Sequence, residues 1–136
     1  MDAIDHLSIG MSAEMTLVVS KEMTIRHFVA GLPYVYATPM MVLHMEMAAG
    51  SAIADALPVG FVSVGMEVNI RHLAATPIGS TVRAIARVTA VGAKSVVFDV
   101  EAWNERRKIG EGTHRRGIVD VREFEKRFGV KETAFA

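Results

Sequence analysis

One run of residues, 37–49, constrains the fold of this chain more than any other segment. Its sequence is ATPMMVLHMEMAA, which is apolar at nearly every position but carries Glu46 near its centre. A helix that is apolar on all sides is surrounded by protein. An ionised carboxylate in such surroundings is destabilising unless it is paired, hydrogen-bonded or shifted in pKa. The segment therefore predicts a central helix that carries Glu46 for a reason other than packing.

The two ends of this helix are marked by residues that start and stop helices. Thr38 is expected to cap the first amides, and Pro39 is compatible with the first turn. Pro58 and Gly60 are expected to end the helix after about Leu57. One long helix therefore lies within a chain that is otherwise made mainly of strands.

Four segments after the helix alternate apolar and polar residues with the two-residue period of strands. They are 62–70, 82–90, 96–102 and 109–121. A further strand is expected at 14–19, an irregular connection at 21–37, and a short helix at 122–128. The order of strand, helix and antiparallel meander predicts an α+β fold, with the helix packed on one face of a sheet of about five strands.

The composition sets limits on the class of protein. A chain of 136 residues is expected to form one domain, 1–136. Fifteen basic and fifteen acidic residues give a net charge of zero, so no nucleic-acid partner is expected. The absence of cysteine excludes disulfides and thiolate metal sites. No membrane span or secretion signal is recognisable, and a cytoplasmic protein is expected.

Three side chains suggest chemistry. Glu46 offers a nucleophile or base, His72 a proton carrier and Thr38 a hydroxyl. Eight helical residues separate Thr38 and Glu46 by about 12 Å. Either the regular helix begins after Thr38, or the two act on different substrate atoms, or sites are assembled across a dimer. In the structural alternatives, Thr38 is only a cap and Glu46 pairs with Arg71 or Arg116.

Several segments, in their order and spacing, carry a resemblance to a known family. They are Ala37-Thr38, Met45-Glu46, Val64-Gly65, 72–79 and 109–116. Over roughly residues 14 to 124, the chain resembles the fluoroacetyl-CoA thioesterase-like family of hotdog-fold hydrolases. The resemblance implies a long central helix wrapped by a curved antiparallel sheet. It also implies a homodimer, or a higher oligomer, with active sites at the subunit interface that hydrolyse acyl-CoA thioesters without metal or other cofactor.

The resemblance also assigns roles to individual residues. Thr38, Glu46 and His72 fall on the catalytic positions of the family. Gly65 falls where the family has a backbone group near the reacting carbonyl, and Arg116 falls close to the acyl pocket. Glu46 acts either as a nucleophile that gives a transient anhydride or as a base that activates water, and the sequence leaves both open.

The acyl pocket is expected to be shaped by Tyr36 and Met40, among other residues near the helix start. Segment 28–36 looks shorter than the lid-bearing region of the family, and Leu32 is the nearest counterpart of its aromatic lid residue. We therefore expect a small or medium acyl group and a range broader than fluoroacetyl.

Two glycines and an arginine allow more than one interpretation. Gly110 and Gly112 lie inside a strand pattern, which indicates either room for the pantetheine arm or a bulge that curves the sheet. His114 and Arg116 share a strand face. Arg116 could neutralise a substrate group or pair with Glu46 or Glu67.

Two other functions compete with thioester hydrolysis. A non-catalytic acyl-CoA-binding hotdog module would retain Glu46 for structure or ligand polarity. A hotdog hydratase requires an aspartate followed within a few residues by a histidine on one loop-to-helix segment, and no such pair is present. No ligand spacing indicates a metal site, because His44 and Glu46 point about 200° apart around the helix.

Overall fold

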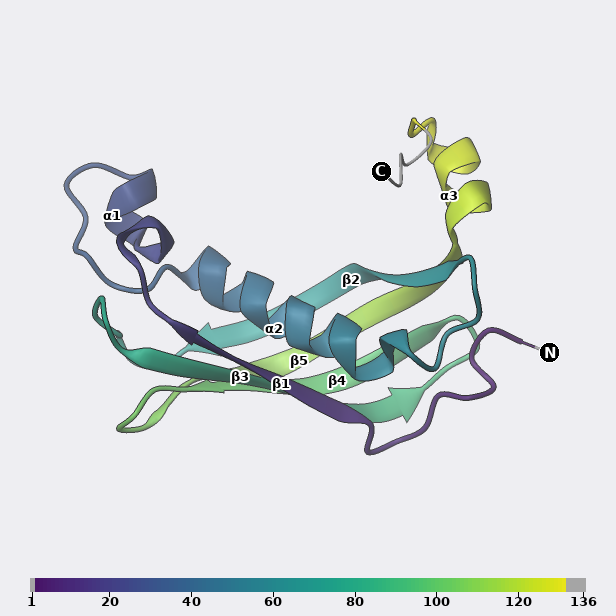
Figure 1. Ribbon diagram of the computed structural model, residues 1–136, viewed down its shortest axis with the longest axis horizontal. Coiled ribbons are helices and arrows are strands. Elements are labelled where there is room, and N and C mark those ends of the chain that lie inside the picture. Colours follow the sequence, from purple (N-terminus) through teal and green to yellow (C-terminus); the bar gives the residue numbers. More distant parts are fainter. Residues whose placement is uncertain (1, 132–136) are drawn as a thin grey trace.

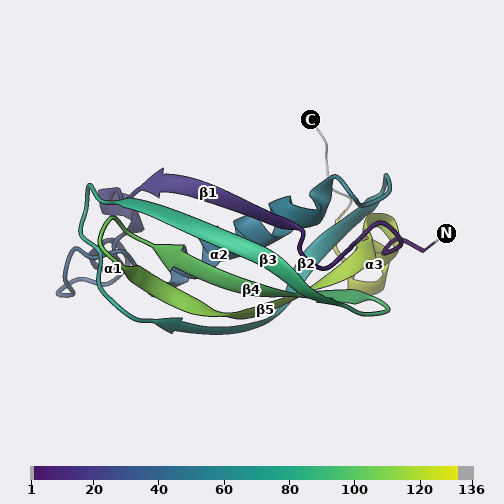
Figure 2. The same ribbon diagram turned by 90° about the horizontal axis from the view of Figure 1, so that it is seen from below.

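The computed structural model describes residues 2–131 and places one long helix across a five-stranded sheet. In chain order the elements are β1 Ser12–Val18, η1 Lys21–Met23, α1 Ile25–Phe28, α2 Thr38–Ala54, β2 Phe61–His72, β3 Thr81–Val91, β4 Ser95–Trp103, β5 Lys108–Asp120 and α3 Val121–Phe128. Figure 1 shows α2 lying along one face of the curved sheet. Figure 2, from below, shows the opposite face, with α2 behind the strands. The predicted α+β architecture is confirmed.

The sheet is antiparallel between all neighbours, in the order β1-β3-β4-β5-β2. β2 follows α2 in the chain but pairs with β5, so β2 forms one edge of the sheet. The register of this pair sets Gly65 opposite Arg116 and His72 opposite Gly110. It is this long-range pairing that gathers the predicted site residues beside α2.

The core lies between α2 and the sheet. Alternate residues of β3 and β4 are fully buried against the helix, namely Val82, Ala84, Ala86, Val88, Val96, Phe98, Val100 and Ala102. On the helix, Met41, Met45 and Ala49 form part of the buried stripe, at the four-residue spacing of one helix face. Leu43 and Met47 point away from this core and remain exposed. The helix is therefore enclosed on one side only, although its sequence predicts burial on every side.

Gly110 and Gly112 permit two close approaches within this core. A Cβ atom at Gly110 would lie 2.5 Å from the Met41 sulfur, and one at Gly112 would collide with the backbone carbonyl of Asn69. The space beside Gly110 is thus filled by Met41, and of the two alternatives the register supports the bulge. The register between β4 and β5 shifts beside Gly110, as a bulge requires.

The start of α2 differs from its prediction. Ala37 is the capping residue, and Thr38 is already helical and makes no side-chain cap. The expected capping role of Thr38 is therefore wrong, which leaves its hydroxyl available for another partner. The helix also ends at Ala54, with Asp55 as its C-cap, rather than at about Leu57.

Strand β3 departs from the predicted alternation, and helix α3 agrees with its prediction. The two-residue alternation of β3 breaks at a bulge between Val88 and Ala90, which leaves Ala90 exposed. The short helix expected at 122–128 is confirmed as α3, where the rings of Phe124 and Phe128 lie 4.9 Å apart. Asp120 begins this helix, because its carboxylate accepts hydrogen bonds from two free amides.

Candidate active site

The first part of the candidate site is a hydrogen bond between Thr38 and His72. The Thr38 Oγ1 lies 2.7 Å from the His72 Nδ1, because β2 ends beside the first turn of α2. Burial lowers the pKa of His72, and the backbone of Ala74 acts in the opposite direction. With its proton on Nε2, the neutral ring accepts from the threonine hydroxyl, which is the arrangement of an activated hydroxyl.

The other nitrogen of His72 is free for a further partner. Its Nε2 is buried and has no hydrogen-bond partner within the described part of the chain. A buried polar atom without a partner is rare in a folded protein. This atom is therefore available to a group from a substrate or from a second subunit.

The second part of the site surrounds Glu46. The Arg116 Nη1 lies 3.5 Å from the Glu46 Oε2, and the same guanidinium donates from Nε to the Ser63 hydroxyl and from Nη2 to the Ser63 carbonyl, each at 2.8 Å. Gly65 lies directly against the carboxylate, since a Cβ at this position would be 2.9 Å from Oε2. Arg71, the other candidate partner, pairs instead with Glu111 at 2.7 Å. Glu46 is thus a paired carboxylate whose side chain is 34% exposed.

His114 joins this second group, although sequence reasoning placed it only on the same face as Arg116. The His114 ring is 2% exposed, and its Nε2 lies 3.2 Å from the Arg116 Nη1. Its Nδ1 lies 2.8 Å from the backbone carbonyl of Glu67. The two-residue spacing of His114 and Arg116 was the signal that could have predicted this contact.

The two groups remain separate in a single chain. No hydrogen bond or ion pair among residues 2–131 joins Thr38 or His72 to Glu46 or Arg116. Because α2 is helical from Thr38 onward, the possibility that the helix begins later is wrong. Of the three expectations for this pair, two remain: that Thr38 and Glu46 act on different substrate atoms, or that sites are assembled across a dimer.

Tyr36 and Met40 are expected at the acyl pocket; Tyr36 lies just before α2, and Met40 lies in its first turn. Tyr36 is buried, its hydroxyl hydrogen-bonds the His44 Nδ1, and the two rings stack with centroids 5.7 Å apart. Burial raises the pKa of Tyr36. Met40 is half-buried against the core, and Leu32 is exposed. Tyr36 thus has a structural partner, whereas Met40 and Leu32 present surface near the Thr38 end of the helix.

Two hollows lie on the described part of the chain, and no predicted catalytic residue lines either of them. One, of about 620 Å³, lies between residues 74–80 and the β4–β5 turn, and begins two residues after His72. Arg106 and Arg107 line it, and Asn104 joins its two walls by a 3.1 Å hydrogen bond to Thr76.

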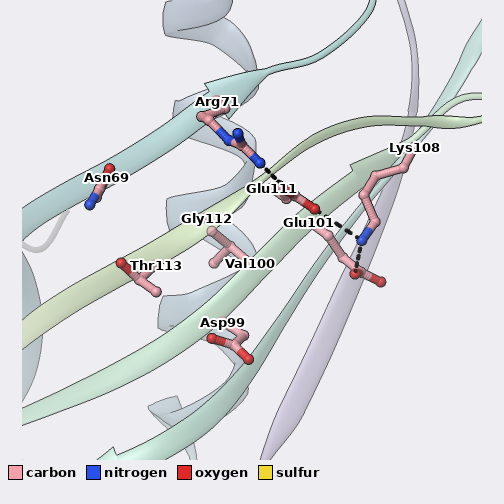
Figure 3. A pocket seen from close by; sticks show the side chains of 9 residues that line it. All are labelled: Asn69, Arg71, Asp99, Val100, Glu101, Lys108, Glu111, Gly112 and Thr113. Carbon is pink, nitrogen blue, oxygen red and sulfur yellow. Dashed lines mark hydrogen bonds and ion pairs between the residues drawn. The ribbon is translucent and has the colours of Figure 1, made fainter.

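The other hollow, of about 410 Å³, lies over β2, β4 and β5 (Figure 3). Figure 3 shows a series of ion pairs across this hollow: Arg71 pairs with Glu111, and Lys108 pairs with both Glu111 and Glu101. None of the predicted catalytic residues lines it.

Within the described residues, no cluster of three or more metal-binding side chains is found. No helix of that same part is long and apolar enough to cross a membrane.

The lowered pKa values of three histidines determine how the stability of the fold is expected to depend on pH. Burial lowers the pKa of His44, His72 and His114. The unfolded chain takes up these protons near the ordinary pKa of about 6.5, whereas the folded protein resists them. The contribution of these histidines to the free energy of unfolding is therefore complete above about pH 6.5. As the pH decreases below this value, the free energy of unfolding decreases by at most about 1.4 kcal/mol per pH unit for each histidine. We expect Tm to decrease between pH 7.5 and 5.5; a constant or rising Tm would contradict this.

Comparison with known proteins identifies relatives of this chain. The sequence profile of the fluoroacetyl-CoA-specific thioesterase family matches residues 19–122. A fluoroacetyl-CoA thioesterase of Streptantibioticus cattleyicolor is 32% identical, over 96% of this chain and 98% of that protein. A solved structure of the fluoroacetyl-CoA thioesterase FlK has a TM-score of 0.87 at 32% identity and covers 95% of this chain and 100% of its own. A FlK variant has also been solved with fluoroacetate and CoA.

The structural likeness first defines the class. A hot-dog-like protein of Thermanaerovibrio acidaminovorans superposes with a TM-score of 0.87 at 25% identity, over 98% of this chain and 99% of its own. The architecture is therefore that of the hotdog-fold thioesterases. Within that class, the chain belongs to the fluoroacetyl-CoA-specific thioesterase family.

Proposed function

We propose that this protein is a hydrolase that converts small or medium acyl-CoA thioesters into the free acid and CoA. The observation that carries the proposal is the hydrogen bond between Thr38 and His72, in a chain of a thioesterase family. A hydroxyl paired with a neutral imidazole supplies a proton donor and a proton carrier at one point. A purely structural pair would not explain why the second nitrogen of His72 is buried without a partner among residues 2–131.

In the proposed reaction, Glu46 attacks the thioester carbonyl or activates a water molecule that does so. In this proposal the backbone at Gly65, which lies against the Glu46 carboxylate, stabilises the oxyanion that develops. The proton released by the attacking water, or by the water that hydrolyses the transient anhydride when Glu46 is the nucleophile, passes through His72 to the thiolate of CoA. Thr38 orients this imidazole. Arg116 holds Glu46 and borders the acyl group.

The proposed enzyme is a homodimer. β2 is an edge strand, and its residues Val62, Met66 and Val68 are exposed although they are apolar. On α2, which runs beside β2 in Figure 1, Leu43 and Met47 are also exposed. An apolar edge strand next to an apolar helix face favours pairing with a second copy of the chain. A dimer through this surface would bring the Thr38–His72 and Glu46–Arg116 groups of different subunits into one site.

A charge on this surface is expected to separate the subunits. Met66 is 63% exposed in the single chain. The substitution Met66→Asp would bury an unpaired carboxylate in the dimer interface. We expect light scattering to give the mass of one 14.8 kDa chain for this variant, twice that mass for the wild type, and loss of turnover with dissociation. Val59→Asp, in an exposed turn outside the surface, is the control and should remain dimeric. A fully active monomeric wild type would exclude a site that needs two subunits.

The nucleotide end of CoA is proposed to lie at the hollow that follows His72. Arg106 and Arg107 line this hollow, and neither has an ion-pair partner within residues 2–131. Guanidinium groups suit phosphate. A CoA thioester substrate also favours a cytoplasmic location for the protein.

The acyl range is tested by release of free thiol from a panel of acyl-CoA esters. The panel contains acetyl, fluoroacetyl, medium-chain and phenylacetyl thioesters at equal concentration. Because Leu32 is the nearest counterpart of the aromatic lid residue of the family, we expect turnover of several esters without strong preference for fluoroacetyl-CoA. Turnover confined to fluoroacetyl-CoA would contradict the broad range. Binding of the esters without turnover would favour the alternative, a non-catalytic acyl-CoA-binding module.

A further inference from the structure

A continuous set of hydrogen bonds runs from β2 through β5 to the helix. The Glu67 carbonyl lies 2.8 Å from the His114 Nδ1, the His114 Nε2 lies 3.2 Å from the Arg116 Nη1, and this nitrogen lies 3.5 Å from the Glu46 Oε2. The ring of His114 is buried against Phe98, with ring centroids 6.2 Å apart. The proposed mechanism uses Glu46 and Arg116 but gives His114 no role.

The two neighbours of His114 allow only one placement of its proton. A backbone carbonyl accepts and never donates, so the Nδ1 facing Glu67 must carry a hydrogen. A guanidinium donates and never accepts, so the Nε2 facing Arg116 must be free of hydrogen. Both contacts are satisfied together by the neutral ring protonated on Nδ1. A second proton on Nε2 would place two N–H groups and two positive charges against each other.

His114 completes the support of Arg116. Ser63 engages the Nε and Nη2 of the guanidinium, which leaves Nη1 to divide its two hydrogens between His114 and Glu46. A free lone pair on the His114 Nε2 thus sets the direction of Nη1, and with it the hydrogen bond that reaches Glu46.

We propose that His114, as a neutral imidazole protonated on Nδ1, is a positioning residue that holds Arg116 in the orientation that pairs with Glu46. This inference rests on the proposed function for its effect on catalysis. Charged groups face the ring from two elements, Glu46 from α2 and Arg116 from β5. β2 presents the Glu67 carbonyl and β4 the Phe98 ring. Burial lowers the pKa of His114; the carbonyl and Glu46 act against this, while Arg116 adds to it.

The placement of the proton is tested by ¹⁵N NMR of the histidine rings in the full-length protein. We expect the His114 ring at pH 7 to be neutral with its hydrogen on Nδ1. Arg116→Gln removes the nearby cation and should raise the pKa of His114, whereas Glu46→Gln removes the nearby anion and should lower it. A hydrogen on Nε2, a doubly protonated ring at pH 7, or shifts of the same sign in both variants would overturn the inference.

The effect on catalysis is tested by steady-state thiol release from the best acyl-CoA substrate. His114→Leu keeps bulk but removes the acceptor, and we expect kcat to fall roughly ten- to a hundredfold with little change in KM. His114→Gln returns an amide oxygen near the position of Nε2 and should give a kcat between those of His114→Leu and the wild type. Equal loss in both variants at matched Tm, or a change confined to KM, would overturn the positioning role. A wild type that releases no thiol would refute the proposed function, while the NMR result still decides the state of His114.

Discussion

Glutamine in place of Glu46 is expected to lower kcat by about 10²–10⁴-fold, the loss typical of a missing general base or nucleophile. Glutamine has nearly the same size, and its amide oxygen can still accept from Arg116 in place of the Glu46 Oε2. The variant therefore removes the negative charge while retaining the packing against Gly65. Because the Glu46 side chain is partly exposed, we expect a small change in Tm.

The control for this variant is a carboxylate outside the site. Glu14 lies on β1 and forms an exposed ion pair with Arg83 at 3.3 Å, so Glu14→Gln should leave kcat within about twofold, since exposed pairs contribute little. Both variants are compared with the wild type by thiol release and by thermal unfolding. A Glu46→Gln enzyme that retains more than a tenth of wild-type kcat would remove Glu46 from the centre of the mechanism.

Alanine at Gly112 is expected to cause the largest loss of stability in the chain, about 3–5 kcal/mol. Its Cβ would collide with the backbone carbonyl of Asn69, so β2 and β5 would have to separate at this point. The matched variant is Gly110→Ala in the same strand, where the obstacle is the flexible end of the Met41 side chain. A side chain that can rotate limits the expected loss there to about 1–3 kcal/mol.

Urea unfolding of both glycine variants measures this difference. We expect Gly112→Ala to have a markedly lower transition midpoint than Gly110→Ala. It should also lose activity, because β2 carries Gly65 and His72. Equal midpoints would show that β2 can move away from β5 without penalty, and that the register which forms the site is not fixed by this contact.

The fold could be predicted from the sequence because its signals are local. The alternation in β3 and β4 and the apolar helix each follow from residues near in sequence. Features that depend on long-range pairing could not be predicted. The bulge between Val88 and Ala90 turns Ala90 outward. Apolar and polar residues still alternate through this position in the sequence, so the pattern does not predict the bulge. The hydroxyl of Thr38 suits a cap, yet His72 at the end of β2 takes it instead.

In the candidate site too, the sequence indicates individual residues but not the contacts that depend on long-range pairing. Residue chemistry and family resemblance singled out Glu46 and His72, but their partners depend on the β2–β5 register. Gly65 lies opposite Arg116 because a bulge follows it in β2, and the sequence does not mark that position. The two-residue spacing of His114 and Arg116 indicates a shared strand face, and the distances from His114 to Arg116 and Glu67 then reveal its place beside Glu46.

The most direct test of thioester hydrolysis is to follow thiol release and acid formation together over many turnovers of the wild-type protein. The proposed function predicts equal amounts of CoA and free acid from at least one small or medium acyl-CoA, far in excess of the enzyme concentration. Saturable binding of acyl-CoA esters with no product, by folded protein in its native oligomeric state, would contradict it.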